Sequence, residues 1–178
     1  MVNSDMRRVL AVLLASLPVA CATTGATPRP FPTPGTPPPT TSAVPLPAVP
    51  SRDAYAISGT ALTLRGIPYR NGGSDPRGFD CSGFVWYVFG QHGIQLPRTV
   101  TEQAQAGDPV EPSTLQAGDL VFFDTRGPAF GRRQATHVGI SIGGEEFVHA
   151  PSTTGEVRVE RLGSSYWSTR FLEARRVQ

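Results

Sequence analysis

Apolar residues recur at helical spacing near the end of the chain's first third. Ala54, Ile57, Ala61 and Leu64 lie three or four positions apart, and Gly66 follows them. This period predicts an amphipathic helix, and the glycine supplies its stop signal.

A second helix is expected over Cys81–Gln91, because residues 84–89 are apolar on every side, as in a buried helix. A loop rich in Gly, Asn and Asp (residues 68–80) precedes it, and a short helix is expected over residues 99–106. The chain then changes to short apolar runs between turn residues, which predicts an antiparallel meander. These runs are residues 119–123, 137–142, 145–150, 157–162 and 171–177. Helices followed by strands predict an α+β fold, with N-terminal helices packed on a five- to six-stranded antiparallel sheet.

The first 50 residues predict an exported protein. Arg7 and Arg8 precede a short apolar stretch, and small residues lead up to Cys21, which is typical of a signal peptide over residues 1–20. A cysteine at this point resembles the lipidation site of bacterial lipoproteins and implies a lipid on Cys21. The sequence Ala20-Cys21-Ala22 also fits ordinary secretory cleavage, so secretion without a lipid stays open.

Residues 21–50 are expected to form a lipid-anchored, proline-rich linker to a folded domain over residues 51–178. Ten of the 23 residues from position 28 to position 50 are proline. Such a segment cannot bury enough apolar surface to fold, and it favours extended polyproline II. We therefore expect a semi-rigid spacer between a membrane and the domain.

Composition limits what the domain can bind. The chain has 178 residues, which is enough for one domain, and a net charge of +2, which argues against broad nucleic-acid binding. Its two cysteines cannot form a disulfide framework or a four-thiolate zinc site. We expect a monomer.

Cys81 is the only thiol of the predicted domain and lies at the start of the apolar helix. The backbone N–H groups and the dipole of a helix N-terminus favour the nucleophilic thiolate, so this position predicts a lowered thiol pKa. A small buried core cysteine is the structural alternative.

Two of the three histidines flank a predicted β-turn. His137 begins one strand, His149 ends the next, and their spacing of twelve puts them opposite each other on one face if a three-residue turn or a bulge lies near Gly143. That face would carry His137, Gly139, Ser141, Phe147 and His149. Two imidazoles beside a thiol supply a nucleophile, a base and an orienting group. A Cys-His-His metal site is an alternative, and His92 is expected to be a solvated cap after the helix.

The motifs around these residues resemble the NlpC family of papain-like bacterial cell-wall cysteine peptidases. They are DCSGFV around Cys81, THVGISIG around His137 and EFVHA around His149, with RGIPYRNGG, LPRT and AGDLVFF in the same order. The resemblance covers about residues 54–175, and several ordered motifs make it specific. It implies a papain-like fold, with Cys81 as nucleophile, His137 as base and His149 as the orienting third residue.

The resemblance also suggests residues that contact substrate. It implies that Tyr69 lines the site near the oxyanion, whereas Asn71 stands where the family often has an aromatic residue. Asp80 and Ser82 flank the nucleophile and are expected to contact substrate, although Asp80 could simply cap the following helix. The loop over residues 125–135 is expected to shape the rim of a groove or to be a solvated loop.

The activity implied by the resemblance is hydrolysis of amide bonds in peptidoglycan stem peptides, next to diaminopimelate, through a thioester acyl-enzyme. No metal or organic cofactor is expected. The protein is expected at a membrane facing the periplasm, the outer membrane where the cell has one, or at the cell wall. Two alternatives stay open: a catalytically silent wall-binding lipoprotein, and an amide-directed acyltransferase.

Overall fold

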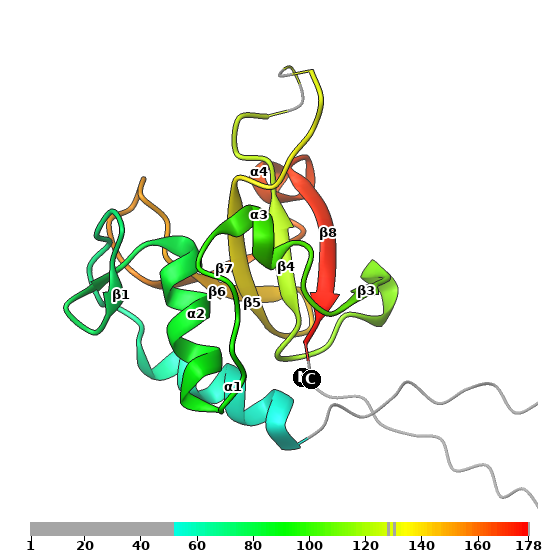
Figure 1. Cartoon of the computed structure of the whole chain (residues 1–178). Coiled ribbons are helices and arrows are strands. Elements are labelled where there is room, and N and C mark those ends of the chain that lie inside the picture. The colour runs from blue at the N-terminus through cyan, green and yellow to red at the C-terminus, as the bar shows by residue number, and fades with distance from the viewer. Residues whose placement is uncertain (1–51, 128, 130, 178) are drawn as a thin grey trace, which may run out of the picture. The chain divides into compact units, whose positions relative to one another are not determined.

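The computed structural model describes residues 52–127, 129 and 131–177, shown in colour in Figure 1. The predicted signal peptide, the lipidation site Cys21, the whole of the predicted linker and its boundary with the domain lie outside the described residues. These remain predictions.

Two helices lie close to their expected positions. The first, α1 (Arg52–Thr63), begins slightly before the predicted start, and α2 (Cys81–Gln91) has the predicted bounds. The third, α3 (Val100–Gln103), is shorter than expected. Thr99 is its N-cap and accepts a hydrogen bond from the Glu102 N–H, and Ala104 is already its C-cap. A 3₁₀ turn (Pro112–Thr114) and α4 (Ser165–Ser168) complete the helices of the described part of the chain, none of which is long and apolar enough to cross a membrane.

The predicted α+β architecture is confirmed, with one six-stranded antiparallel sheet in the order β3-β8-β4-β5-β6-β7. The strands are β3 (Asp108–Val110), β4 (Leu120–Phe123), β5 (His137–Gly143), β6 (Glu146–His149), β7 (Arg158–Arg161) and β8 (Phe171–Arg176). Helices α1 and α2 form a layer beside it (Figure 1).

A simple meander is correct only for β4 to β7. The last strand, β8, returns to pair with β4 on the side away from β5, and β3 pairs with β8 at the edge. A two-stranded hairpin, β1 (Ser74–Asp75) with β2 (Gly78–Phe79), lies inside the segment expected to be a loop. Strands of two residues have no measurable alternation, so the hydrophobic pattern misses them.

The two faces of the sheet pack against different apolar clusters. Phe122, Val138 and Val148 belong to the larger cluster, which also contains Phe84 and Val88 of α2. The second cluster lies on the other face; its buried members are Val121, Phe123, Phe147, Ala174 and Trp167 of α4. Alternate residues of β4 and β6 therefore serve two separate packing regions, and every residue of β5 from His137 to Ser141 is buried.

The bulge that the histidine spacing required is present between β5 and β6. Ser141 pairs with Phe147 and Gly143 with Glu146, so Ile142 is the extra residue. The predicted shared face is found, but the register differs from the expected one. Because Ile140 pairs with Val148, His149 lies across from Gly139 instead of His137, and the two histidines are diagonal neighbours.

Candidate active site

Cys81 is the first residue of α2, where it is partly buried. Asp80 caps the helix, because its Oδ1 accepts a hydrogen bond of 2.7 Å from the Gly83 N–H. The thiol receives backbone N–H groups from Cys81 itself, from Ser82 and from Val138 of β5. The helix N-terminus is thus joined to the sheet beside His137.

The pKa of the Cys81 thiol is raised, so the prediction of a lowered pKa at the helix N-terminus is wrong in this structure. Burial raises the thiol pKa most, and the neighbouring Asp80 carboxylate raises it further. The three backbone N–H groups lower the thiol pKa, but burial and the Asp80 charge outweigh them.

A guanidinium compensates the Asp80 charge. Arg98, from the LPRT motif, donates to Asp80 Oδ2 at 2.7 Å, to Asp80 Oδ1 at 3.0 Å and to Ser82 Oγ at 2.9 Å. It also donates to the Gly73 carbonyl at 3.2 Å, so it ties the loop before the nucleophile to the start of α2. Asp80 therefore caps α2, which the sequence analysis gave as the alternative to substrate contact. Substrate contact by Asp80 or Ser82 stays a prediction.

The two histidines form one buried pair. His137 Nε2 lies 2.7 Å from His149 Nδ1, and the rings are nearly perpendicular, at 85°. Burial lowers the pKa of His137 to about 4, and burial with the nearby His137 and Arg158 lowers the pKa of His149 to about 2. Both rings are therefore neutral near pH 7.

Because Nε2 of His137 is engaged by His149, its Nδ1 is the nitrogen that remains for the thiol. No hydrogen bond joins the thiol to this ring among the described residues. The thiol instead contacts the N–H of Val138, the next residue along β5. Hydrogen bonds between catalytic groups often tighten only around bound substrate.

Three residues around the histidines were not foreseen as parts of the site. The Trp167 ring stacks on His137 at 24° and 5.6 Å between centroids, and meets the His149 ring edge-on at 5.0 Å. Its Nε1 donates a hydrogen bond to Glu160 Oε2. The other oxygen of Glu160 lies 3.9 Å from His149 Nε2 and 3.3 Å from Arg158 Nε. The β6–β7 register brings Arg158 and Glu160 to His149, and α4 brings Trp167, so no local pattern in the sequence points to these contacts.

Tyr69 lies near the nucleophile. Its N–H donates to the Gly155 carbonyl at 2.7 Å, and its backbone bridges to Phe79. Burial raises the pKa of its hydroxyl, with further contributions from Cys81 and Asp80. The phenol therefore lies within electrostatic range of the thiol, whereas Asn71 is exposed.

The remaining histidine, His92, lies apart from the Cys81, His137 and His149 site. His92 caps the C-terminus of α2, and its Nε2 lies 2.9 Å from Thr60 Oγ1 of α1. No three His, Cys, Asp or Glu side chains of the described residues are arranged to hold a metal ion.

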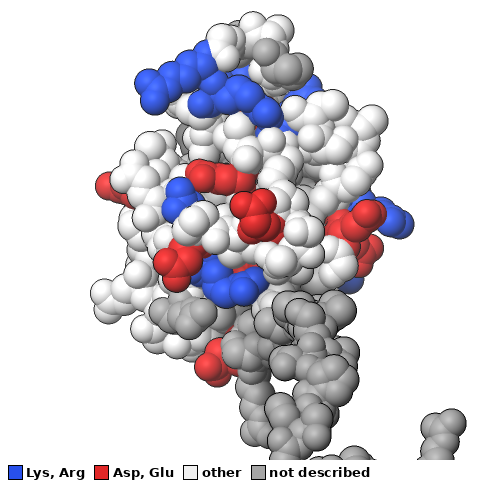
Figure 2. Space-filling model, turned by 90° about the vertical axis from the view of Figure 1, so that its right-hand side faces the viewer, with Lys and Arg blue, Asp and Glu red and all other residues white. Residues whose placement is uncertain are grey.

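The loop before His137 carries a group of arginines, and Figure 2 shows basic side chains gathered at the end of the molecule where this loop lies in Figure 1. Arg126 pairs with the buried Asp124 at 2.7 Å. Arg133 donates to the carbonyls of Thr169 and Phe171 at 3.3 and 2.9 Å. These contacts commit two arginines to holding the loop against the sheet.

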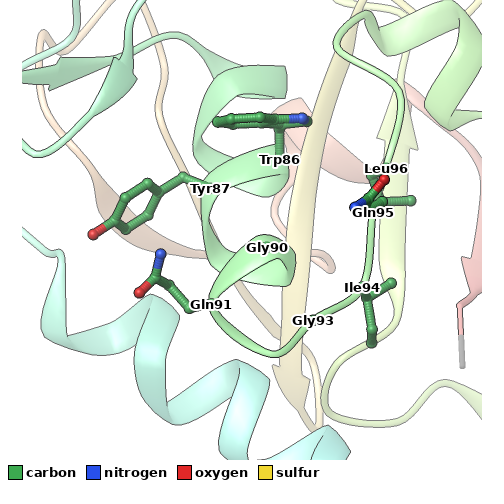
Figure 3. Close-up of a pocket in the computed structure, with 8 residues that line it drawn as sticks. All are labelled: Trp86, Tyr87, Gly90, Gln91, Gly93, Ile94, Gln95 and Leu96. Atoms are coloured by element: carbon green, nitrogen blue, oxygen red, sulfur yellow. The ribbon is translucent and has the colours of Figure 1, made fainter.

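A hollow of about 490 Å³ lies beside the C-terminal half of α2 (Figure 3). Trp86 stands at one edge, Ile94 and Gln95 come from the loop after the helix, and Gly90 and Gly93 leave the space between them open. None of the predicted catalytic residues lines this hollow.

Comparisons with known proteins agree with the motifs. Residues 66–176 match the NlpC/P60 family. The chain is 46% identical over 114 residues to the murein DD-endopeptidase MepS/murein LD-carboxypeptidase of Escherichia coli strain K12, covering 64% of this chain and 57% of that protein. It is 38% identical over 122 residues to the gamma-DL-glutamyl hydrolase of Bacillus subtilis strain 168, covering 68% of this chain and 29% of that protein.

Solved structures share the fold. The NlpC/p60 domain of the peptidoglycan hydrolase SagA superposes with a TM-score of 0.60 at 34% identity, over 70% of this chain and 98% of that domain. The chain spans only 57% and 29% of the length of the two relatives named above.

Proposed function

Because the chain belongs to the NlpC/P60 family, we propose that it hydrolyses amide bonds in the stem peptides of peptidoglycan, with Cys81 as the nucleophile. The observation that carries this proposal is the convergence on one end of β5 of a thiol at a helix N-terminus and a neutral histidine pair. The names of the relatives support the substrate class.

The reaction begins from a neutral thiol and a neutral imidazole. As Sγ of Cys81 attacks the amide carbonyl carbon, Nδ1 of His137 takes the thiol proton. The carbonyl oxygen becomes an oxyanion, which we expect the Cys81 N–H and the Tyr69 hydroxyl to stabilise. One such donor typically contributes about 3–4 kcal/mol to the transition state.

The intermediate then collapses. The C–N bond breaks, His137 gives its proton to the leaving amine, and a thioester to Cys81 remains. Water attacks the thioester carbonyl, its proton passes to His137, and the C–S bond breaks. The thiolate then recovers that proton from His137, which restores the starting state.

His149 orients the base in this scheme. Its ring lies 2.7 Å from Nε2 of His137, and we propose that this contact leaves Nδ1 for the nucleophile. A neutral imidazole in this place fixes direction without adding a negative charge.

We propose the D-Ala–diaminopimelate cross-link as the bond cleaved, because the relative at 46% identity is a murein DD-endopeptidase. The γ-D-Glu–diaminopimelate bond is the second candidate, and the gamma-DL-glutamyl hydrolase at 38% identity favours it. The masses of the products distinguish the two bonds.

The proposed setting is outside the cytoplasm. A signal peptide over residues 1–20, a lipid on Cys21 and a proline-rich spacer would hold a monomeric domain at a membrane and let it reach the wall. Intact mass after membrane extraction tests this directly. A diacylated or triacylated Cys21 supports the tether, and a free N-terminus at residue 22 or beyond rules it out.

The central test is digestion of purified sacculi by the chain and by its Cys81→Ala variant, read by mass spectrometry of the released muropeptides. Split cross-links with the wild type and none with a folded Cys81→Ala variant support the proposal. Hydrolysis by the variant would remove Cys81 as nucleophile. Binding to sacculi without any cleavage by the wild type would point to a silent module, and products with a new amide to an acyltransferase.

A further inference from the structure

His149 has a buried polar atom, Nε2, that has no role in the proposed mechanism. Its side chain is fully buried, Nδ1 faces His137, and Nε2 makes no hydrogen bond to any described residue. Such an atom costs free energy unless a neighbour interacts with it. Glu160 Oε1, at 3.9 Å, is the acidic oxygen facing it.

The state of that nitrogen decides whether His137 can act as a base. A neutral imidazole carries one N–H, so the hydrogen bond between the rings has two opposite arrangements. If His149 carries its proton on Nε2, its Nδ1 accepts from His137 Nε2–H, and His137 Nδ1 has a free lone pair. If His149 carries it on Nδ1, that lone pair is lost and His137 cannot take the thiol proton.

We infer that Glu160 is a positioning residue, which fixes the proton of His149 on Nε2 and thereby leaves Nδ1 of His137 as the basic nitrogen. The inference deepens the proposed function and rests on it for the identity of the base. A carboxylate attracts an N–H that points at it and repels a lone pair in the same place. Both effects favour the arrangement that catalysis needs.

The strand register places Glu160 for this task. On β7 it pairs with Phe147, and its neighbour two positions back, Arg158, pairs with His149, so all four side chains share one face. Arg158 Nε lies 3.3 Å from the same Oε1 atom, and the Trp167 indole donates to Oε2. These two donors hold the carboxylate in place beside the histidine.

The contact is not an ion pair. Burial, with the nearby His137 and Arg158, lowers the pKa of His149 and keeps it neutral, so Glu160 acts on the direction of one N–H bond. The alternative is that Glu160 has only a structural role, in which it accepts the Trp167 hydrogen bond and fixes that ring. The two differ in one measurable property, which is the nitrogen that carries the proton in each ring.

Two-bond ¹H–¹⁵N correlation spectra of the full chain, labelled with ¹⁵N histidine, read that property at neutral pH. The chain has three histidines, and His92 is an internal reference far from Glu160 in sequence. We expect Nε2–H in both His137 and His149. Nδ1–H in His149 would overturn the inference, and this measurement needs no variant.

Substitutions then test the cause. Glu160→Leu should populate the other arrangement and lower kcat at least about tenfold, with little change in KM. This loss should be smaller than the roughly 10⁴-fold loss seen when a base held by a direct contact has the wrong tautomer. Glu160→Gln keeps an acceptor oxygen and should retain the wild-type tautomers. Glu146→Leu, on an exposed residue of the adjacent β6, is the matched control and should change neither quantity.

Trp167→Phe separates the two explanations. It removes the indole N–H that reaches Glu160 but keeps a ring against the histidines. Wild-type tautomers in Trp167→Phe and altered ones in Glu160→Leu support direct action by Glu160, while equal changes in both would assign it only an anchoring function. Correct tautomers in a chain that cleaves no muropeptide would contradict the proposed function and leave this inference standing.

Discussion

His137 Nε2 and His149 Nδ1 lie 2.7 Å apart inside the protein, on neighbouring strands and diagonal to each other. In the proposed mechanism, the ring of His137 transfers protons and the ring of His149 only directs it. We therefore expect His137→Ala to lower kcat/KM by about 10²–10⁴-fold, the usual contribution of a general base, and His149→Ala to lower it less. Kinetics on a defined cross-linked muropeptide measure both. The reverse ranking would mean that the two roles are exchanged.

The buried histidines should make stability depend on pH between about 6.5 and 4. The folded pKa of His137 is lowered to about 4, so below about pH 6.5 the unfolded chain binds a proton that the folded chain refuses. The free energy of unfolding is therefore complete above this window and falls as pH decreases through it, by up to about 1.4 kcal/mol per pH unit for each such histidine. Guanidinium unfolding at pH 7.5, 6.5, 5.5 and 4.5 measures the slope.

Its control is His137→Gln, which should reduce the slope by the His137 contribution and leave that of the buried His149. Asp75 and Asp124 do not interfere, because neighbouring arginines lower their pKa values below the usual 3.8, and their effect on stability lies at more acidic pH. If the free energy of unfolding of the wild type stays constant or increases as the pH is lowered from 6.5 to 4.5, the burial of neutral histidines is contradicted.

Removing the Arg98 guanidinium should both loosen α2 and weaken the nucleophile. Arg98→Gln breaks the contacts to Asp80, Ser82 and the Gly73 carbonyl, which we expect to cost about 1–3 kcal/mol in unfolding free energy. It also leaves the Asp80 charge uncompensated, so the pKa of the Cys81 thiol should rise further. The pH dependence of iodoacetamide alkylation reports that pKa.

The matched control is Arg77→Gln. Arg77 also pairs with an aspartate, Asp75 at 3.0 Å, but its side chain is 83% exposed, so screening by solvent removes most of the effect. We expect unchanged stability and unchanged alkylation. An Arg98→Gln variant that behaves like this control would remove Arg98 from any part in the site.

The absence of a side chain at Gly139 gives His149 its place. A Cβ at this position would lie 2.7 Å from the Phe147 ring, 3.0 Å from the Val148 carbonyl oxygen and 3.2 Å from the His149 Cβ. Gly139→Ala should therefore displace both side chains of β6, cost about 1–3 kcal/mol and reduce kcat. Thermal unfolding and muropeptide kinetics measure the two effects.

The same substitution at Gly59 is the comparison. This glycine lies inside α1, where a Cβ would have no atom within 4 Å. Gly59→Ala should stabilise the protein by about 0.5–1 kcal/mol through helix propensity and leave kcat unchanged. Gly139→Ala with full activity would show that the register around His149 tolerates displacement.

The parts of the site that the sequence predicts are those set by neighbours along the chain. The cap at Asp80, the start of α2 at Cys81 and the bulge between His137 and His149 all follow from local spacing. Burial is not local, and so the raised pKa of the Cys81 thiol could not be predicted from helix position alone.

The missed residues act across the fold. Arg98 is 18 positions from Asp80, and Glu160 is 11 from His149, and by composition each is an ordinary surface charge. Their contacts depend on how α2 meets its following loop and on the β6–β7 register. The return of β8 to β4 likewise has no local signal, because a strand's apolar pattern does not specify its partner.

The half-buried thiol at the start of α2 also provides a single position at which labelling of the domain can be quantified. The chain has two cysteines, and Cys81 is the only one among the described residues. A small electrophilic inhibitor that reacts there would add one fixed mass increment to the domain. Intact-protein mass spectrometry would then report the fraction of inhibited molecules directly, without a turnover assay, and an activity-based probe of the same chemistry could follow the protein in whole cells.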